Sequence, residues 1–356
     1  MSEANKTQRP APQTGGTKKK NAVSRFISNH SKWLMIAPPL YYMVFLFLIP
    51  FLLALKISFA DSILAVPPFT SLYEYQEGHL VLNLSMLNFQ ALIHDVVAWK
   101  SEVVFAISNF GEWVAGWFGS APSVVEEVTK PEPSQYLAAF VESLRLATVS
   151  TVICLLVGYP VAYAIARAPK ARQNIYIMLI ILPFWTSFLL RVYALQGVLR
   201  DSGLLNQLLM ALGFIDEPIH ILQTTLAVQI GITYSYAPFM VLPLYATLQK
   251  LDPTLLEAAS DLGSRPFRAF LDVTLPLSMP GVIAGSMLTF IPAMGEYIIP
   301  DMLGGPGVQT IGRVLWDTFF SDRDWPMASA VSIAFLLFLV VPIGIYQYFS
   351  IREREA

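Results

Sequence analysis

Residues 251–279 read LDPTLLEAASDLGSRPFRAFLDVTLPLSM and carry the signals of a short helical hairpin. Asp252 is a typical N-cap residue, and Pro253 suits the first helical position. Gly263 predicts the helix end, because the turn that follows needs a left-handed residue. Ser264 then predicts the cap of a second short helix. A hairpin of this size does not fold alone, so it either docks into a groove of a partner protein or lies on a membrane surface.

The chain on both sides of this hairpin is too apolar for a water-soluble protein. Hydrophobic residues make up 55% of the 356 residues, charged residues only 13%, and the mean hydropathy is +0.55. Soluble domains average about 25% charged residues. A helix needs about 20 consecutive apolar residues to cross a bilayer. Six runs predict an all-α polytopic membrane protein with six transmembrane helices: 33–56, 143–166, 174–196, 223–247, 280–300 and 327–348.

Lysine and arginine gather in alternate connections between these runs. They lie in the tail 1–32, after the second run, in the hairpin 251–279 and in the tail 349–356. Since basic connections stay on the cytoplasmic side, both termini are expected to be cytoplasmic. The tail 1–32 is expected to be disordered, and its basic residues also suit contact with a lipid surface. The segment 57–135 is then periplasmic. Its stretch 103–118 is expected to form an interfacial helix, because a seventh span would invert every later connection.

The sequence lacks the motifs of common enzymes and metal sites. It contains no phosphate-binding loop, no HExxH and no GxSxG motif. A single cysteine, Cys154, and four scattered histidines make no metal framework, so no metal and no cofactor is expected in this chain. A net charge of −2 leaves no basic face for nucleic acid. If the protein uses ATP, another subunit must hydrolyse it.

Two ionisable residues lie inside predicted spans, where charge is costly and therefore often functional. At 1.5 Å per residue, Arg191 and Glu296 fall about 25 Å along their spans, which makes them a candidate ion pair. Glu296 is also the candidate to meet a cationic substrate. Arg191 would repel a cation, so it would hold Glu296 or a gate, or snorkel to the interface. The aromatic residues that would line a path for a cation are Tyr297, Trp185, Tyr193 and Tyr236.

Within the hairpin, Glu257-Ala258-Ala259, three residues, Gly263, nine residues and Val273-Thr274-Leu275-Pro276 resemble the EAA loop of ABC importer permeases. Val273 stands where the family pattern has isoleucine. Further stretches resemble the spermidine/putrescine branch of the family, and the likeness extends over about 140–345. These stretches are LPFWTS at 182–187, YAPFMVLP at 236–243 and GEYIIP at 295–300. The external segment 96–133 departs from the branch because it is longer.

The resemblance implies the type I ABC importer (MetI-like) transmembrane fold over residues 140–348. It implies that the hairpin is a coupling helix for an ATPase subunit, through Glu257, Ala258, Ala259, Gly263, Leu275 and Pro276. It further implies two ATPase subunits that hold ATP and Mg, a second and homologous permease subunit, and a periplasmic substrate-binding protein. The location that it implies is the bacterial inner membrane.

We therefore expect a permease subunit, not an enzyme, that moves putrescine or spermidine by alternating access. The same class carrying another small organic cation or an amino-acid-like solute is the nearest alternative. A stand-alone secondary transporter or channel would need no coupling loop, and a membrane enzyme would show catalytic residues clustered on one membrane face. The segment Asp301–Pro326 either caps the bundle or contacts a binding protein, and its aromatic residues are Trp316, Phe319, Phe320 and Trp325.

Overall fold

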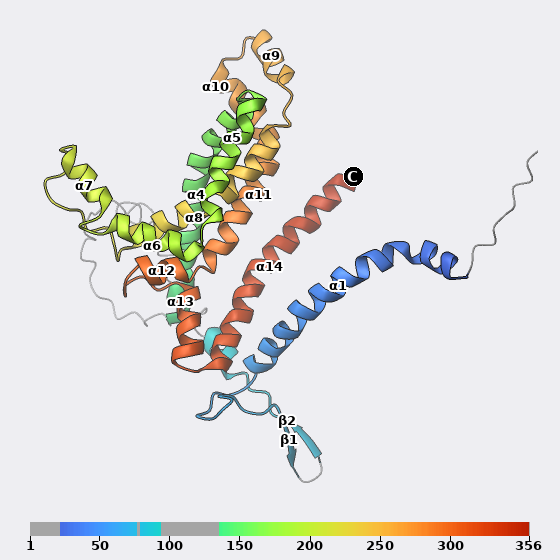
Figure 1. The fold of residues 1–356 in the computed structure, drawn as a ribbon. Helices are drawn as coiled ribbons and strands as arrows, with labels where there is room; N and C mark the ends of the chain where they lie inside the picture. Colours follow the sequence, from blue (N-terminus) through green and yellow to red (C-terminus); the bar gives the residue numbers. More distant parts are fainter. Residues whose placement is uncertain (1–21, 77–78, 94–134, 356) are drawn as a thin grey trace, which may run out of the picture. The chain divides into compact units, whose positions relative to one another are not determined.

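The computed structural model describes residues 22–76, 79–93 and 135–355 (Figure 1). The first helix, α1, runs over Ala22–Ser58, and its part Ile36–Ser58 is long and apolar enough to cross a bilayer. The predicted first span lies within it. Residues 22–32 were expected in the disordered tail but belong to this helix, because extending an existing helix costs far less than nucleating one. The part of α1 up to Ala54 belongs to a compact unit of its own, so α1 is described by itself.

The segment that follows α1 contains strands that the all-α prediction missed. Strand β1, Tyr73–Gln76, pairs antiparallel with β2, His79–Leu82. A short helix follows over 87–93. The interfacial helix expected over 103–118 lies outside the described residues. Apart from an isolated bridge between Ser62 and Phe69, the regular elements in the rest of the described chain are helices, so the strands are a small addition to a helical fold.

Three helices pack against one another and form the core of the remaining chain. They are α4 (Gln135–Arg167), α8 (Thr225–Leu248) and α11 (Leu275–Met294). The predicted spans 143–166 and 223–247 lie within or at the ends of α4 and α8. Helix α11 approaches α8 closely at Gly285, where an added Cβ would lie 2.9 Å from the sulfur of Met240. A side chain at this position would push the two helices apart.

The predicted third span, 174–196, is wrong as a single straight helix. In its place the structure has α5 (Lys170–Ile181), the 3-10 turn η1 (Leu182–Trp185) and α6 (Phe188–Leu199), and the short helix α7 (Leu204–Ala211) follows beyond the predicted span. The part that begins with α6 leaves the first part at an angle of 92°. Proline at 183 favours such a break, because it has no N–H to donate. Thr186 is extended, and its hydroxyl donates to the carbonyl of Pro183 at 2.7 Å.

The fifth predicted span, 280–300, begins and ends earlier than predicted. Helix α10 (Pro266–Ala269) and the π-helical η2 (Phe270–Thr274) lead directly into α11, so that Pro266–Met294 is one continuous helix. The second short helix expected after Ser264 is therefore the first turn of this span, and Arg265 is its N-cap residue. Because the helix stops at Met294, Glu296 lies beyond its end and not in its outer third.

The chain closes with four helical segments. These are α12 (Ile298–Leu303), α13 (Ile311–Trp316), the π-helical η3 (Asp317–Ser321) and α14 (Trp325–Glu355). The predicted last span, 327–348, lies within α14. In the part of the chain that is described, four helices are long and apolar enough to span a membrane, and the bent α5–α6 pair would be a fifth. The apolar stretch Trp325–Val340 of α14 is shorter than these four helices.

Candidate functional site

The hairpin predicted at 251–279 begins with helix α9, Thr254–Asp261. We call Asp252–Ala269 the coupling hairpin. The Asp252 carboxylate accepts a hydrogen bond from the Thr254 amide at 3.0 Å. This bond lowers the pKa of the Asp252 carboxyl, because it stabilises the charged form. The carboxylate therefore satisfies one of the free amides at the start of α9, as the sequence predicts.

The end of α9 is a Schellman turn, as the glycine at 263 predicts. Gly263 has φ +80°, in the left-handed region. Its amide donates to Ser260 at 2.9 Å, and the Ser264 amide donates to Ala259 at 3.0 Å, the two bonds of this motif. Helix α7 ends in the same motif at Gly213, which has φ +73°. The described part of the chain thus contains two equivalent glycine turns, only one of them in the coupling hairpin.

The coupling hairpin exposes apolar side chains. Helix α9 has no buried residue, Leu262 is 89% exposed, and Phe267 is 73% exposed. Glu257 and Ala258 are exposed as well, whereas Ala259 is half-buried. Large apolar side chains left in solvent on so short a segment are typical of a surface that a partner covers.

Leu275 and Pro276 lie beyond the coupling hairpin, and Leu275 is half-buried whereas Pro276 is exposed. Both lie at the start of α11, and Leu275 packs against a buried cluster of α4 and α8. Leu275 is therefore placed at the base of the hairpin, where it joins the hairpin to the core.

Phe270, which the sequence did not single out, joins the coupling hairpin to the core. It is the first residue of η2, and its ring meets Tyr159 edge-on at 5.5 Å and Tyr163 at 6.2 Å. The Tyr159 hydroxyl in turn lies 2.8 Å from the hydroxyl of Ser278 on α11. Movement of the hairpin would consequently act on both α4 and α11.

At the other end of α11, Glu296 is the centre of a buried polar turn. The side chain of Glu296 accepts hydrogen bonds from the amides of Ile298 (3.0 Å) and Ile299 (3.3 Å) and from the hydroxyl of Tyr236. Thr310 donates to the Glu296 carbonyl at 3.2 Å. The residue is only 8% exposed. We call residues 295–299 with Tyr236 the Glu296 turn.

The candidate ion pair between Arg191 and Glu296 does not form in the structure. Arg191 lies on α6, and its guanidinium packs over the rings of Phe184 at 4.7 Å and Phe188 at 5.6 Å. The bend after η1 explains why the pair does not form. The prediction placed Arg191 and Glu296 at equal depth in the membrane, and this holds only if the third span is a straight helix. A series of rings separates the two charges instead. Phe184 meets Phe239 at 5.3 Å, and Phe239 meets Tyr236 at 6.0 Å.

The other predicted aromatic residues do not gather at one place. Tyr236 reaches Glu296 directly, as described above. Tyr297 instead stacks on Trp316 at 4.7 Å. Trp185 and Tyr193 are exposed, on η1 and α6. The structure therefore brings Tyr236 and Glu296 together and leaves the remaining candidates on other surfaces.

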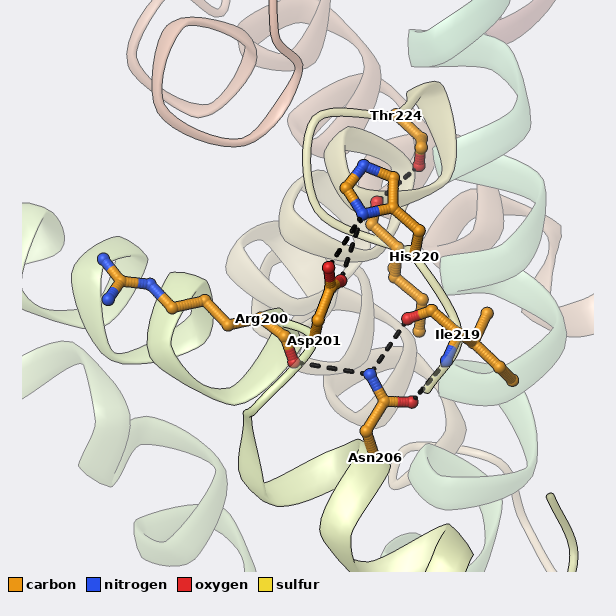
Figure 2. Close-up of polar contacts among 7 residues, drawn as sticks. Arg200, Asp201, Asn206, Ile219, His220 and Thr224 are labelled. Atoms are coloured by element: carbon orange, nitrogen blue, oxygen red, sulfur yellow. Dashed lines mark hydrogen bonds and ion pairs between the residues drawn. The ribbon is translucent and has the colours of Figure 1, made fainter. Parts of the chain in front are cut away.

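Polar contacts that the sequence did not predict fix the connection between α6 and α8 (Figure 2). The side-chain amide of Asn206 donates to the carbonyls of Ile219 (2.9 Å) and Arg200 (3.4 Å), and its oxygen accepts from the Ile219 amide (2.9 Å). Figure 2 also shows His220 beside Asp201, with Nδ1 at 3.0 and 3.2 Å from the carboxylate oxygens. Asn206 is fully buried, so this clamp shapes the connection, whereas the histidine pair lies in solvent.

Solved structures with the same fold are ABC transporter chains. A chain of a bacterial ABC transporter involved in the import of the acidic polysaccharide alginate matches with TM-score 0.60 and 14% identity, over 93% of this chain and 98% of the other. A chain of the bacterial alginate ABC transporter in complex with an alginate pentasaccharide-bound periplasmic protein matches with TM-score 0.50 and 16% identity, over 75% and 94%. At these identities the likeness shows the fold.

One relative is much more similar in sequence than these two structures are. The spermidine/putrescine transport system permease protein PotB of Haemophilus influenzae is 41% identical over 229 residues, which are 64% of this chain and 80% of the relative. Residues 136–355, well over half of the chain, match the family described as binding-protein-dependent transport system inner membrane component. The predicted importer-permease fold is confirmed, and the chain belongs to this family of inner membrane transport components.

Proposed function

We propose that this chain is the permease subunit of an ABC importer for a polyamine, putrescine or spermidine. In this proposal the chain holds no cofactor, and two ATPase subunits hold the ATP and Mg that drive alternating access. The observation that carries the coupling role is the coupling hairpin, with its Schellman turn at Gly263 and its exposed Leu262 and Phe267. A helix in a groove of the ATPase would cover these side chains. The name of the relative PotB supports the cargo.

The remaining partners follow from the same proposal. The coupling hairpin and both termini would lie on the cytoplasmic side, as the distribution of basic residues favours. A second, homologous permease subunit would complete the path through the bilayer. A periplasmic binding protein would deliver the cargo, and the alginate transporter bound to its periplasmic protein supports that assembly.

The path for the cargo would pass the Glu296 turn. Glu296 is a carboxylate with rings on one side, the series Tyr236, Phe239 and Phe184. An ammonium group is attracted both by a carboxylate and by the faces of such rings. Arg191 at the far end of the series would repel the cargo, so it would mark a barrier and not a binding position. Trp185 and Tyr193, which are exposed, would be covered by the second permease subunit.

The first experiment is uptake of labelled putrescine and spermidine in cells with and without the gene. We expect the intact gene to restore uptake, and Gly263→Val to fail because it distorts the turn of the coupling hairpin. Gly213→Val is the matched control, since it places the same side chain in the same turn outside the hairpin. Normal uptake by both variants would argue for a stand-alone transporter. Loss in both would show a folding defect instead of lost coupling.

The role of Glu296 needs a separate variant. Glu296→Gln keeps the size of the side chain and removes its charge, so we expect loss of uptake while the complex with the ATPase subunits still assembles. Unchanged uptake would remove the cargo role of Glu296. If neither amine is transported by the intact gene, other small organic cations and amino-acid-like solutes are tested in the same cells, and the polyamine assignment is withdrawn.

A further inference from the structure

Three aromatic rings form a continuous surface at the end of α11 opposite the coupling hairpin. The Tyr297 and Trp316 rings stack at 4.7 Å, and Trp316 lies 4.2 Å from Phe320. We call these three residues the aromatic ledge. Trp316 is 44% exposed and Phe320 is 55% exposed, so both rings keep open area beyond their contacts with each other. A ledge of this kind has π surface available for a ligand.

One carboxylate, Asp317, directly follows Trp316 of the ledge in the chain and is exposed. Burial, and after it the negative charges of Asp301 and Asp317, raise the pKa of Tyr297. Arg313 is already engaged: its Nε lies 3.7 Å from Asp301, and its Nη1 donates to the carbonyl of Gly305 at 2.6 Å. Among the residues that the structure describes, no ion pair to Asp317 is found. Asp317 is thus an exposed negative charge next to open rings.

The local backbone holds these groups in an unusual turn. Asp317–Ser321 is π-helical, and the Asp322 amide donates to the Asp317 carbonyl at 2.9 Å, a step of five residues. Single π turns have less favourable packing than α turns and occur frequently at functional sites. Phe319 of this turn stacks on Trp325 at 5.0 Å and meets Phe320 edge-on at 4.9 Å, so the turn packs against the start of α14. Asp317 and Phe320 are therefore presented by a fixed element.

We propose that the aromatic ledge and Asp317 bind a linear alkyl diammonium ion before it reaches the Glu296 turn. Ring faces attract ammonium groups, and their apolar area suits the methylene groups between two such charges. Asp317 would pair with one ammonium group. The second would point towards Glu296, which precedes Tyr297 in the chain. The inference rests on the proposed function, since it gives a polyamine an outer binding position on the same path.

Equilibrium binding of labelled putrescine to the purified full chain in lipid nanodiscs tests the site. Replacing Trp316 by leucine keeps an apolar side chain but removes the π face, and we expect about two- to fivefold weaker binding. Trp316→Tyr is expected to retain most of the affinity. Asp317→Asn is expected to weaken binding about two- to fivefold, as for an exposed ion pair. Asp322→Asn is the matched control and is expected to bind like the unchanged chain. Butane-1,4-diol is expected not to compete.

The outcomes separate this site from the proposed function. Equal binding by Trp316→Leu, Asp317→Asn and the unchanged chain would overturn the site, as would the absence of any putrescine binding to the chain. Uptake by cells would then decide the proposed function independently. If cells show no polyamine uptake but putrescine binding still depends on Trp316 and Asp317, the site stands and the cargo assignment fails. Normal putrescine binding with loss of binding-protein docking in both variants would make the ledge a protein contact and overturn the inference.

Discussion

The coupling hairpin and the Glu296 turn lie at opposite ends of the same helix, Pro266–Met294, and different contacts hold them. The hairpin is built from neighbours in sequence, such as the bond from Thr254 to Asp252, and α9 buries none of its residues. The Glu296 turn depends on Tyr236, which is 60 residues away in the chain. The difference teaches that the coupling hairpin can dock and release as a local unit, whereas the Glu296 turn is part of the core.

The largest expected effect comes from removing the buried carboxylate. Glu296→Ala leaves the Tyr236 hydroxyl and two backbone amides without their acceptor. Because hydrogen bonds to charged groups contribute roughly 1.5–3 kcal/mol each, we expect the free energy of unfolding to fall by about 3 kcal/mol or more. Thermal unfolding of the purified chain in detergent measures this change. Glu257→Ala, at the exposed end, is the control and is expected to stay within about 0.5 kcal/mol. Equal losses would remove the distinction between the two ends.

A smaller effect is expected where α8 and α11 touch. Gly285→Val would place methyl groups against Met240, whose sulfur already lies within 2.9 Å of an added Cβ. Overpacking of this kind costs about 1–3 kcal/mol. Gly197→Val is the control, because an added Cβ on α6 meets nothing within 4 Å. Unfolding of both variants is compared in the same detergent. A stable Gly285→Val variant would mean that the helices can separate freely.

The two Schellman turns test whether local backbone geometry alone decides how far the free energy of unfolding falls when the glycine is replaced. Gly263→Ala and Gly213→Ala each force alanine into a left-handed conformation, and neither Cβ meets an atom within 4 Å. We expect each to lower the free energy of unfolding by about 1 kcal/mol. Chemical denaturation of both variants measures the costs side by side. A clearly larger cost at Gly263 would show that the coupling hairpin contributes to the global fold.

The smallest effect concerns the start of α9. The folded pKa of Asp252 is lowered, so its carboxylate stabilises α9 above the unfolded pKa of about 3.9, and this contribution is lost as the pH falls through the folded value. We expect the Thr254 amide to exchange faster at acid pH than in Asp252→Asn, because asparagine caps a helix without titrating. Comparing the two chains at each pH removes the intrinsic pH dependence of exchange. Parallel exchange at all pH values would contradict the role of the Asp252 charge.

The sequence predicted the parts of this molecule that depend on neighbours along the chain. The start of α9 at Asp252 and its end at Gly263 are set by capping, which is local. The break at Thr186 was missed because proline also occurs inside α8, at Pro238 and Pro243, without breaking it. The difference is burial: α8 is enclosed by α4 and α11, whereas η1 has no buried residue.

The end of α11 and strand β1 also have signals in the sequence, although neither was predicted. Gly295 directly follows α11 as its C-cap residue, and a glycine there indicates a helix end before Glu296. Tyr73 and Tyr75 alternate with polar residues, which is the period-two pattern of a strand. The partner of Glu296 left no such signal, because the hydrogen bond from Tyr236 joins residues that only the packed helices bring together.

The continuity of the helix Pro266–Met294 makes it a lever between the coupling hairpin and the Glu296 turn. Its 29 residues span roughly 43 Å at 1.5 Å per residue. A tilt of about 5° around its midpoint would carry each end about 2 Å in opposite directions, given that length. The hydrogen bond from the Tyr236 hydroxyl on α8 to Glu296 does not survive such a shift unless α8 moves with the helix. If the helix tilts as one rigid body, a push on the exposed hairpin produces a displacement of equal size beside the buried carboxylate at the far end.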